Sequence, residues 1–433
     1  MKKLLALLLA LCMIFALAAC GQAKPEAKSE VTEITLWTYP IGDWSDADTV
    51  NAMIAKFEAA NPGIKVKVEY LSYADGDAQV DTAIEGKAAP DLIMEGPERL
   101  VTNWGAKGYL VDLADMWDDE DKAEIFEGLQ ASCTYTDGKV YEYPVCMIAH
   151  CMAVNYTRFE AAGVADVLDL NTRTWTTEGF IKAVNALAAA KDGPVAAIYC
   201  KDQGGDQGTR VLVNNLYGGT FTDPAHTRCT LESPENIKAL ELLKSLDGIV
   251  FDPAINGGEE IQLFRQGILD MAFCWNLIQQ NNSDNNDAGL TNDGDRIEFM
   301  AFPSEDGTSK LGVGIWGFGI FDNGDPAKIE AAKTFIKYFA DGEGTPDAIK
   351  ASGFSPARSA AAGQDLTQLF ADDPVATEYM KLLPMAGDYY QVIPGWTQIR
   401  ASWWNMLQQI GGGADVTETA NAFCEYANAA AGA

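Results

Sequence analysis

Aromatic and ionisable side chains stand together at the ends of several segments that have the pattern of β-strands. A tyrosine, an aspartate and a tryptophan follow the strand predicted at residues 34–37, and two glutamates and an arginine follow the one at 91–94. Predicted strands at 270–276 and 312–321 carry tryptophans, and a predicted helix at 393–409 places a tryptophan and an arginine on one side, four residues apart. The members of this set are Tyr39, Asp43, Trp44, Glu95, Glu98, Arg99, Trp275, Asn276, Trp316, Trp396 and Arg400.

These residue types suit the binding of a neutral solute rich in hydroxyl groups. Flat apolar rings match the C–H patches of such a solute, and carboxylate, amide or guanidinium groups pair with its hydroxyls. His150 and Asp206, the latter in a glycine-rich loop at residues 203–210, complete the candidate set. A structural role stays open, because tryptophans near strands commonly fill the core and Glu98 with Arg99 could form only an exposed ion pair.

Composition and motifs exclude several other classes of function. The 31 Lys and Arg residues against 62 Asp and Glu give a formal net charge of −31, which repels nucleic acid and anionic lipid headgroups. The chain has no Gly-x-Ser-x-Gly and no His-Glu-x-x-His motif, and residues 203–210 lack the Gly-Lys-Ser/Thr ending of a phosphate-binding loop. Residues 283–296 do not fit a calcium loop, because Ala288 occupies a ligand position and no glutamate closes the loop.

The cysteines give no sign of a metal site either. Besides Cys12 and Cys20 there are seven, an odd number without a Cys-x-x-Cys pair, which predicts neither a disulfide framework nor a zinc site. We expect most of them to be small buried hydrophobic residues. The sequence therefore predicts no metal and no cofactor.

The elements that position the candidate residues begin as a β-α-β unit. Apolar residues at Val50, Met53, Ile54 and Phe57 have the spacing of an amphipathic helix over residues 46–60, which ends at an Asn-Pro-Gly sequence. Alternating residues at 64–70 predict the next strand. This order predicts a parallel sheet with right-handed crossovers, in which ligands bind at the carboxyl ends of the strands.

A long uncharged stretch organises the middle of the chain. Asp137-Gly138 predicts a hairpin turn between two β-prone runs. The ten residues from 145 to 154 then carry no charge unless His150 is protonated, and they show no helical period. A strand of this length, about 33 Å, either crosses from one folded body to another or forms one long buried strand.

The N-terminus predicts export and lipid attachment. A basic start and an apolar run end in Leu-Ala-Ala-Cys, so residues 1–19 are predicted to be a signal peptide. The ending resembles a bacterial lipobox, which implies a diacylglycerol on Cys20 that anchors the protein to the outer face of the cytoplasmic membrane. The polar residues 20–30 are predicted to be a tether, and the sequence has no second apolar span.

The order of short motifs resembles the family 1 extracellular solute-binding proteins of ABC importers. The motifs are the Asn-Pro-Gly helix stop at 61–63, Ala-Pro-Asp-Leu-Ile at 89–93, Gly-Lys-Val-Tyr at 138–141, Tyr-Pro-Val at 143–145, Val-Asn-Tyr at 154–156, Thr-Trp-Thr-Thr-Glu-Gly-Phe at 174–180, residues 267–275 and Gly-Phe-Ser-Pro-Ala-Arg at 353–358. This resemblance covers essentially the whole mature chain.

The resemblance implies an α/β protein with the type II periplasmic-binding-protein fold, in which two lobes are joined by three crossings. We expect residues 31–147 plus 297–345 to form the N-terminal lobe and residues 148–296 plus 346–433 the C-terminal lobe. It also implies that Trp275 stacks on sugar and that the cluster Glu95, Glu98 and Arg99 contacts hydroxyls. The expected protein is a monomer that delivers its solute to the permease subunits of an importer.

Three hypotheses for the function follow. The first is a receptor for a sugar or oligosaccharide. The second is a receptor for a polyol phosphate such as glycerol 3-phosphate, in which Arg400 would bind the phosphate through two hydrogen bonds. The third is a surface glycosidase with two catalytic carboxylates, although 62 acidic residues make some such pair inevitable.

Overall fold

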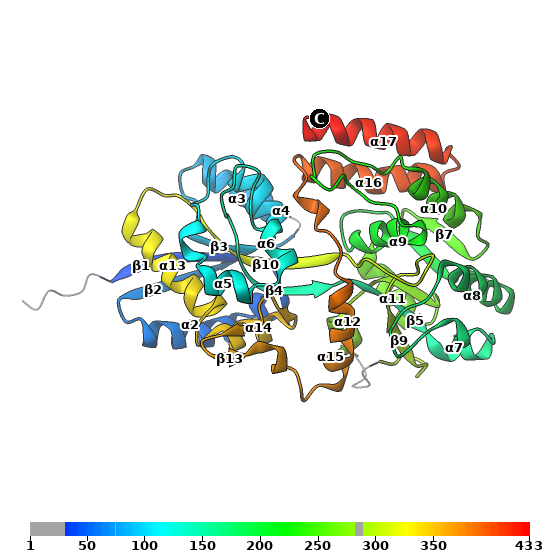
Figure 1. The fold of residues 1–433 in the computed structure, drawn as a ribbon, viewed down its shortest axis with the longest axis horizontal. Helices are drawn as coiled ribbons and strands as arrows, with labels where there is room; N and C mark the ends of the chain where they lie inside the picture. The colour runs from blue at the N-terminus through cyan, green and yellow to red at the C-terminus, as the bar shows by residue number, and fades with distance from the viewer. Residues whose placement is uncertain (1–30, 74, 282–288) are drawn as a thin grey trace, which may run out of the picture.

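The chain folds into two lobes that lie side by side and are joined by extended segments (Figure 1). The computed structural model describes residues 31–73, 75–281 and 289–433. The predicted signal peptide, Cys20 and the tether lie outside these residues, as does part of the loop at 283–296. Within the described ranges, no helix combines the length and the apolar character that a membrane span requires.

The N-terminal lobe is built on a six-stranded sheet in the order β11-β4-β10-β3-β1-β2. The strands β1, β2 and β3 are parallel, and β10 runs antiparallel to β3 and β4. This confirms the predicted β-α-β start, with parallel strands at the expected residues. The strands are β1 (Thr32–Thr38), β2 (Ile64–Tyr70), β3 (Leu92–Glu95), β4 (Tyr143–Ala149), β10 (Val313–Ile320) and β11 (Ser355–Pro356).

Helices cover both faces of this sheet. The first predicted helix is present as α2, where Val50, Met53, Ile54 and Phe57 are buried and the Asp46 side chain caps the amino end. The helices of the lobe are α2 (Ala47–Ala60), α3 (Gly76–Glu85), α4 (Pro97–Arg99), α5 (Asp119–Glu124), α6 (Glu127–Ser132), α13 (Pro326–Ala340) and α14 (Thr345–Ser352), with shorter turns η1 (Gly42–Ser45), η2 (Leu100–Gly105) and η3 (Ala114–Met116).

The long uncharged stretch does cross between the lobes. Its first part, β4, belongs to the N-terminal sheet, and its second part, β5, pairs with β8 and β9 in a separate three-stranded sheet. His150 is the one residue between the two strands. The turn at Asp137-Gly138 also forms, with Gly138 at φ +84°, but only an isolated bridge between Thr134 and Val140 replaces the expected hairpin strands.

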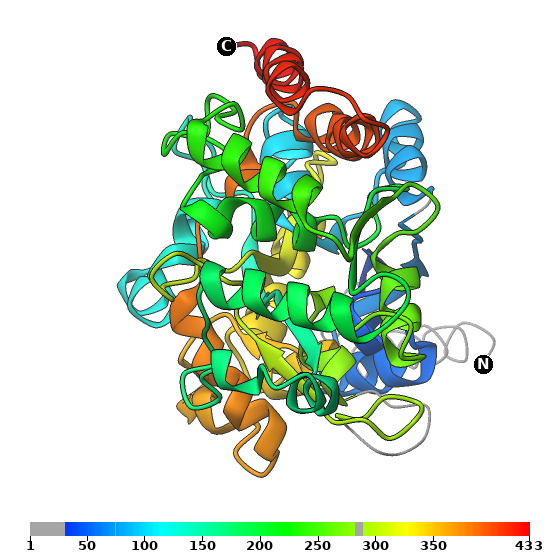
Figure 2. The same cartoon turned by 90° about the vertical axis from the view of Figure 1, so that its right-hand side faces the viewer.

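The C-terminal lobe contains two small sheets enclosed by helices (Figure 2). One sheet has the order β8-β5-β9, and β6 and β7 form a parallel pair. The strands are β5 (Cys151–Asn155), β6 (Ala196–Tyr199), β7 (Ile249–Asp252), β8 (Met271–Trp275) and β9 (Ile297–Met300). The helices are α7 (Tyr156–Ala161), η4 (Ala165–Val167), α8 (Thr177–Ala190), α9 (Gln207–Tyr217), α10 (Pro234–Ser245), α11 (Gly257–Arg265), α12 (Leu277–Asn281), α16 (Trp396–Gly411) and α17 (Val416–Ala431).

Two further segments connect the lobes. The chain passes from β9 to β10 through residues 301–312, and it returns from the N-terminal lobe through a longer segment that ends at α16. That segment runs beside the crossing strands (Figure 1). It contains β12 (Ala360–Ala361), β13 (Gln364–Asp365), η5 (Leu366–Gln368), α15 (Pro374–Tyr379), η6 (Met380–Met385) and η7 (Tyr390–Val392).

Strand pairing does not follow the lobe boundaries that the sequence predicted. β9, at residues 297–300, belongs to the C-terminal lobe because it pairs with β5. β5 itself lies after the first crossing between the lobes. β11 pairs with β4 in the N-terminal sheet, and Arg358 forms ion pairs with Asp121 and Glu124, so residues beyond 346 also belong to the N-terminal lobe. β4 itself extends to Ala149, beyond the predicted end at 147.

Candidate functional site

A cavity of about 240 Å³ lies between the two lobes. The N-terminal lobe contributes residues that follow β2 and β3 together with the first half of β10, and the C-terminal lobe contributes the loop before α9 and one residue of α16. The lining residues are Tyr73, Glu95, Glu98, Arg99, His150, Gln203, Gly204, Gly205, Gln207, Val313, Gly314, Ile315, Trp316, Tyr389, Gln391 and Arg400.

Carboxylates surround Arg99 on the N-terminal side of the cavity. Its guanidinium donates to Asp77 Oδ1 at 2.7 Å, to Glu95 Oε1 at 2.8 Å and to Glu98 Oε1 at 3.4 Å. Pro97 starts the short helix α4 directly after β3, which turns these side chains toward the cavity. Gly96 is required at this turn because a Cβ there would lie 2.8 Å from the carbonyl oxygen of Ile315.

Burial sets the protonation of this cluster. Burial raises the pKa of Glu95 to about 8, although the positive charge of Arg99 opposes the shift. Glu95 is 1% exposed, whereas the side chain of Glu98 retains some access to solvent. With Glu95 neutral at pH 7, the cluster offers hydrogen-bonding carboxyl groups and one shared cation, Arg99.

Aromatic rings form the neighbouring wall. Trp316 on β10 is half-buried and stacks on Phe354, with ring centroids 4.6 Å apart and an angle of 18° between the planes. Tyr73 stacks on the buried Tyr39 at 5.2 Å and remains 40% exposed. Arg99 lies over both tyrosine rings, which fixes the aromatic wall relative to the charged cluster.

The C-terminal side of the cavity depends on a buried aspartate. Asp206 binds Arg400 on α16, with 2.9 Å between Oδ1 and Nη2, and Arg210 on α9, with 2.6 Å between Oδ2 and Nη1. Burial opposes ionisation of Asp206, but the two arginines outweigh it and hold its pKa below the ordinary value. Arg400 also donates to the carbonyl oxygen of Gln203 at 2.9 Å, so this arginine fixes the loop that lines the cavity.

The glycine-rich loop at residues 203–210 packs closely against the C-terminal lobe. Gly205 has φ +73°, and a Cβ on this residue would lie 2.5 Å from the Cys274 sulfur on β8. A Cβ on Gly208 would lie 2.2 Å from the carbonyl oxygen of Phe273. These glycines allow the loop and the start of α9 to approach β8, which presents Gln203 and Gln207 to the cavity.

Contacts between the lobes close part of the cavity. Tyr389 on the connecting segment donates its hydroxyl hydrogen bond to Glu98 Oε2. His150, at the crossing between β4 and β5, lies with Nδ1 3.4 Å from Nε2 of Gln207. Burial lowers the pKa of His150 to about 4, so its ring is neutral at pH 7.

The structure brings six of the residues proposed from sequence to the cavity wall: Glu95, Glu98, Arg99, His150, Trp316 and Arg400. Asp206 and Tyr39 lie directly behind that wall, where they hold Arg400 and Tyr73. Asp43 is exposed outside the cavity, and the Asn276 side chain accepts a hydrogen bond from the backbone N–H of Ile278 at the start of α12.

Three tryptophans expected in the cleft lie in the core instead. Trp44 is 0% exposed and packs edge-on against Phe318 and Phe339. Trp275, 1% exposed, packs against Phe264 and donates its indole N–H to Gln280 at 2.9 Å. Trp396 is 4% exposed among aromatic residues of the C-terminal lobe.

Tyr73, Gln203, Tyr389 and Gln391 line the cavity although they were not among the predicted site residues. Tyr73 follows the alternating strand β2, so the rule that ligands bind at the carboxyl ends of parallel strands could have identified it. Tyr389 and Gln391 lie in a connecting segment without a regular pattern. Their position follows only from the path of the third crossing.

The described cysteines and acidic groups do not have the arrangement that a metal ion requires. In the described part of the chain, no group of three His, Cys, Asp or Glu side chains is placed to hold a metal ion. Six of the seven described cysteines are buried, and Cys274 is partly buried. The sulfur atoms of Cys229 and Cys424 lie 3.2 Å apart, in contact within the core.

Solved structures with the same architecture share little sequence with this chain. The cyclic alpha-maltosyl-1,6-maltose binding protein from Arthrobacter globiformis is 19% identical with a TM-score of 0.73, and the match covers 93% of this chain and 99% of that one. Maltose-bound T. maritima MalE3 has 16% identity and a TM-score of 0.71, over 92% and 99% of the two chains. A ribitol complex of an ABC transporter solute-binding protein from Agrobacterium radiobacter K84 has 22% identity and a TM-score of 0.68, over 92% and 98%.

These likenesses confirm the type II periplasmic-binding-protein fold. No curated protein sequence matches the chain. A family model described as bacterial extracellular solute-binding protein matches residues 42–345, which include both lobes and two of the three crossings. This protein therefore belongs to the family of bacterial extracellular solute-binding proteins.

Proposed function

We propose that this protein captures a neutral carbohydrate in the cavity between its lobes and delivers it to an ABC importer. The observation that carries the proposal is the chemistry of the cavity wall. Aromatic rings of Trp316 and Tyr73 stand beside the amides of Gln203 and Gln207 and beside carboxyl groups that are paired with Arg99. Such a wall offers flat apolar faces and hydrogen-bonding groups to a solute with C–H patches and hydroxyls.

The arginines argue against a phosphorylated solute. Among the described residues that line the cavity, the arginines are Arg99 and Arg400. Arg99 is shared by three carboxylates, and Arg400 uses Nε and Nη2 to bind Asp206 and the loop carbonyl. The hydrogen bonds within the protein use two of the three nitrogens of each guanidinium, Nε and Nη1 in Arg99 and Nε and Nη2 in Arg400. A phosphate bound across two nitrogens of one guanidinium would therefore displace at least one of these partners. A receptor for a polyol phosphate is therefore the weaker alternative.

The structural relatives support the same choice of solute class. One was solved with maltose, one with ribitol and another, from Thermotoga lettingae, with alpha-D-tagatose. All three of these ligands are uncharged and rich in hydroxyl groups. The family consists of binding proteins, which weighs against the third hypothesis of a surface glycosidase.

A thermal-shift panel tests the proposal. The purified protein is heated alone and with neutral mono- and disaccharides, ribitol or glycerol 3-phosphate, because a ligand at 100 times its Kd adds about 2.7 kcal/mol of stability. We expect at least one neutral sugar to raise the melting temperature. A shift with glycerol 3-phosphate alone would favour the phosphate alternative, and release of nitrophenol from chromogenic glycosides would point to an enzyme.

We also propose that the mature protein is anchored to the cell surface through a lipid on Cys20. The support is the Leu-Ala-Ala-Cys ending of the apolar N-terminal run. Two acyl chains on one residue give stable membrane attachment. Cells that express Cys20→Ala should no longer incorporate radiolabelled palmitate into the protein, and continued incorporation would disprove the anchor.

A further inference from the structure

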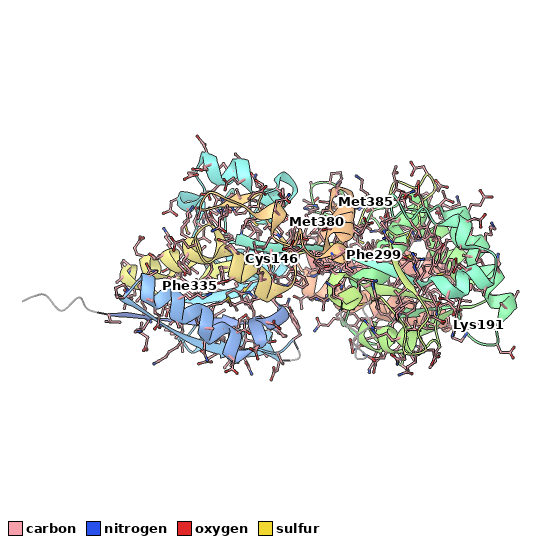
Figure 3. The ribbon with its side chains drawn as sticks, turned by 90° about the horizontal axis from the view of Figure 1, so that it is seen from below. Cys146, Lys191, Phe299, Phe335, Met380 and Met385 are labelled. Carbon is pink, nitrogen blue, oxygen red and sulfur yellow. The ribbon has the colours of Figure 1, made fainter. Side chains whose placement is uncertain are left out.

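A second chamber of about 490 Å³ lies beside the polar cavity. Its walls include Phe126 and Leu129 at the start of α6, Met147 on β4, and Met380 and Leu383 on η6. Among the described residues that line it, Tyr389 is the one with a polar side chain other than methionine sulfur. Figure 3 shows Met380 and Met385 of this segment between the two lobes, next to the crossing strands.

The chamber and the polar cavity share three lining residues. Val313, Ile315 and Tyr389 border both spaces. Tyr389 lies at the boundary between the polar cavity and the apolar chamber. Its hydroxyl donates a hydrogen bond to Glu98 on the polar side, and the residue also lines the chamber. The two spaces therefore adjoin at Val313, Ile315 and Tyr389.

The chamber offers few hydrogen-bonding groups to an occupant. The N–H of Gly387 donates to Leu311 at 2.8 Å and the N–H of Ala386 to Leu383 at 2.9 Å, so these wall donors already have partners. Pro384 has no N–H, and the Met380 sulfur accepts from the hydroxyl of Ser355 at 3.6 Å. A second sugar unit placed here would bury hydroxyl groups without partners, which is costly, whereas an apolar group would lose no hydrogen bonds.

We propose that the solute is a glycoside with an apolar substituent, an aryl or alkyl group, which occupies this chamber while the sugar ring occupies the polar cavity. The inference rests on the proposed function and adds the class of sugar derivative. Methionine and leucine side chains suit such a group because they adapt their shape to apolar ligands.

Calorimetry with matched pairs of glycosides tests the proposal. Methyl and 4-nitrophenyl glycosides of glucose, galactose, mannose and xylose are compared, in both anomeric forms, with the corresponding free sugars and with maltose. We expect the nitrophenyl glycoside of the preferred sugar to bind about 10- to 100-fold more tightly than its methyl counterpart, because an aryl ring is removed from water.

Variants of the chamber wall test whether the difference in affinity between nitrophenyl and methyl glycosides arises in the chamber. Leu383→Asn, at a half-buried wall position, should reduce the advantage of the nitrophenyl group to less than about threefold while the methyl glycoside binds as before. Met380→Gln provides a second wall variant if the first does not fold. Ile268→Asn is the matched control, since Ile268 is 46% exposed and does not line the chamber.

The outcomes separate this inference from the proposed function. Equal binding of methyl and nitrophenyl glycosides, or tighter binding of maltose than of any nitrophenyl glycoside, would overturn the apolar occupant while leaving a sugar receptor in place. An aryl advantage that survives in both wall variants would show that the ring binds elsewhere. Absence of binding by every glycoside and free sugar would overturn the proposed function itself.

Discussion

Truncation of Trp316 is the sharpest test of the proposed site. In Trp316→Ala the ring that stacks on Phe354 at the cavity wall is lost. An aromatic contact with the solute contributes about 0.5–1.5 kcal/mol beyond its buried area, and about 60 Å² of apolar contact adds about 1.5 kcal/mol. We therefore expect a loss of about 2–3 kcal/mol, which corresponds to about 30- to 150-fold weaker binding.

The assay is calorimetry with the sugar that gives the largest thermal shift. Trp316→Phe should recover part of the affinity, because a smaller flat face remains. Trp275→Phe is the matched control: this buried ring packs against Phe264 away from the cavity, so the variant should lose about 1–3 kcal/mol of stability while its Kd is unchanged. Normal binding by folded Trp316→Ala, together with weakened binding by Trp275→Phe, would refute our placement of the site.

Further predictions concern the charged and hinge residues. Because burial lowers the pKa of His150 to about 4, this histidine binds more protons in the unfolded state than in the folded state between pH 6.5 and pH 4, and its contribution to stability should fall by about 1–2 kcal/mol from pH 7 to pH 5. Buried Glu95, with its pKa raised to about 8, changes stability in the opposite direction over this range, so the test is the difference between the unaltered protein and His150→Gln. In urea unfolding the variant should lack the contribution of the histidine, and an identical pH dependence of the two proteins would contradict the assignment. Asp206→Asn should lower the free energy of unfolding in urea by about 3–5 kcal/mol, because Arg210 is 0% exposed and loses its counter-charge. A decrease below about 1 kcal/mol would contradict a structural role for this ion pair. Tyr389→Phe removes the hydrogen bond to Glu98, worth about 0.5–1.5 kcal/mol, and should shift the ligand-free protein toward a more open form with a larger radius of gyration in small-angle scattering. A solute that contacts both lobes should decrease that radius, and an identical profile at saturating solute would count against closure.

Local patterns predicted the elements well where they depend on short-range spacing. The helix α2 has its four periodic residues buried, and it ends at Ala60, directly before the Asn-Pro-Gly sequence. These features depend on backbone geometry and on neighbours within one or two turns, which the sequence specifies directly. The lobe boundaries near 297 and 346 were wrong, because membership of a lobe depends on which distant strand β9 or β11 pairs with.

The candidate site was partly predictable for the same reason. Glu95 ends the short strand β3, and Glu98 and Arg99 follow it at the edge where parallel strands end, which is a general binding position. The tryptophans proposed for the site have different environments in the structure. Trp316 lines the cavity, whereas Trp44 and Trp275 are buried in the core. In the sequence each of these tryptophans lies in or shortly after a predicted strand, so residue type and local pattern could not separate a ligand contact from a core contact.

By itself the sequence determined the β-α-β start of the N-terminal lobe, the extended character of the uncharged stretch around His150 and the acidic, tryptophan-rich character of the chain, but not whether that stretch crosses between the lobes. The tertiary structure decided which rings face the cavity, that Arg400 pairs with Asp206 194 residues away, and that an apolar chamber adjoins the polar site. The physical reason is that periodicity and capping act between near neighbours, whereas burial and ion pairing depend on which distant segments the three crossings bring together.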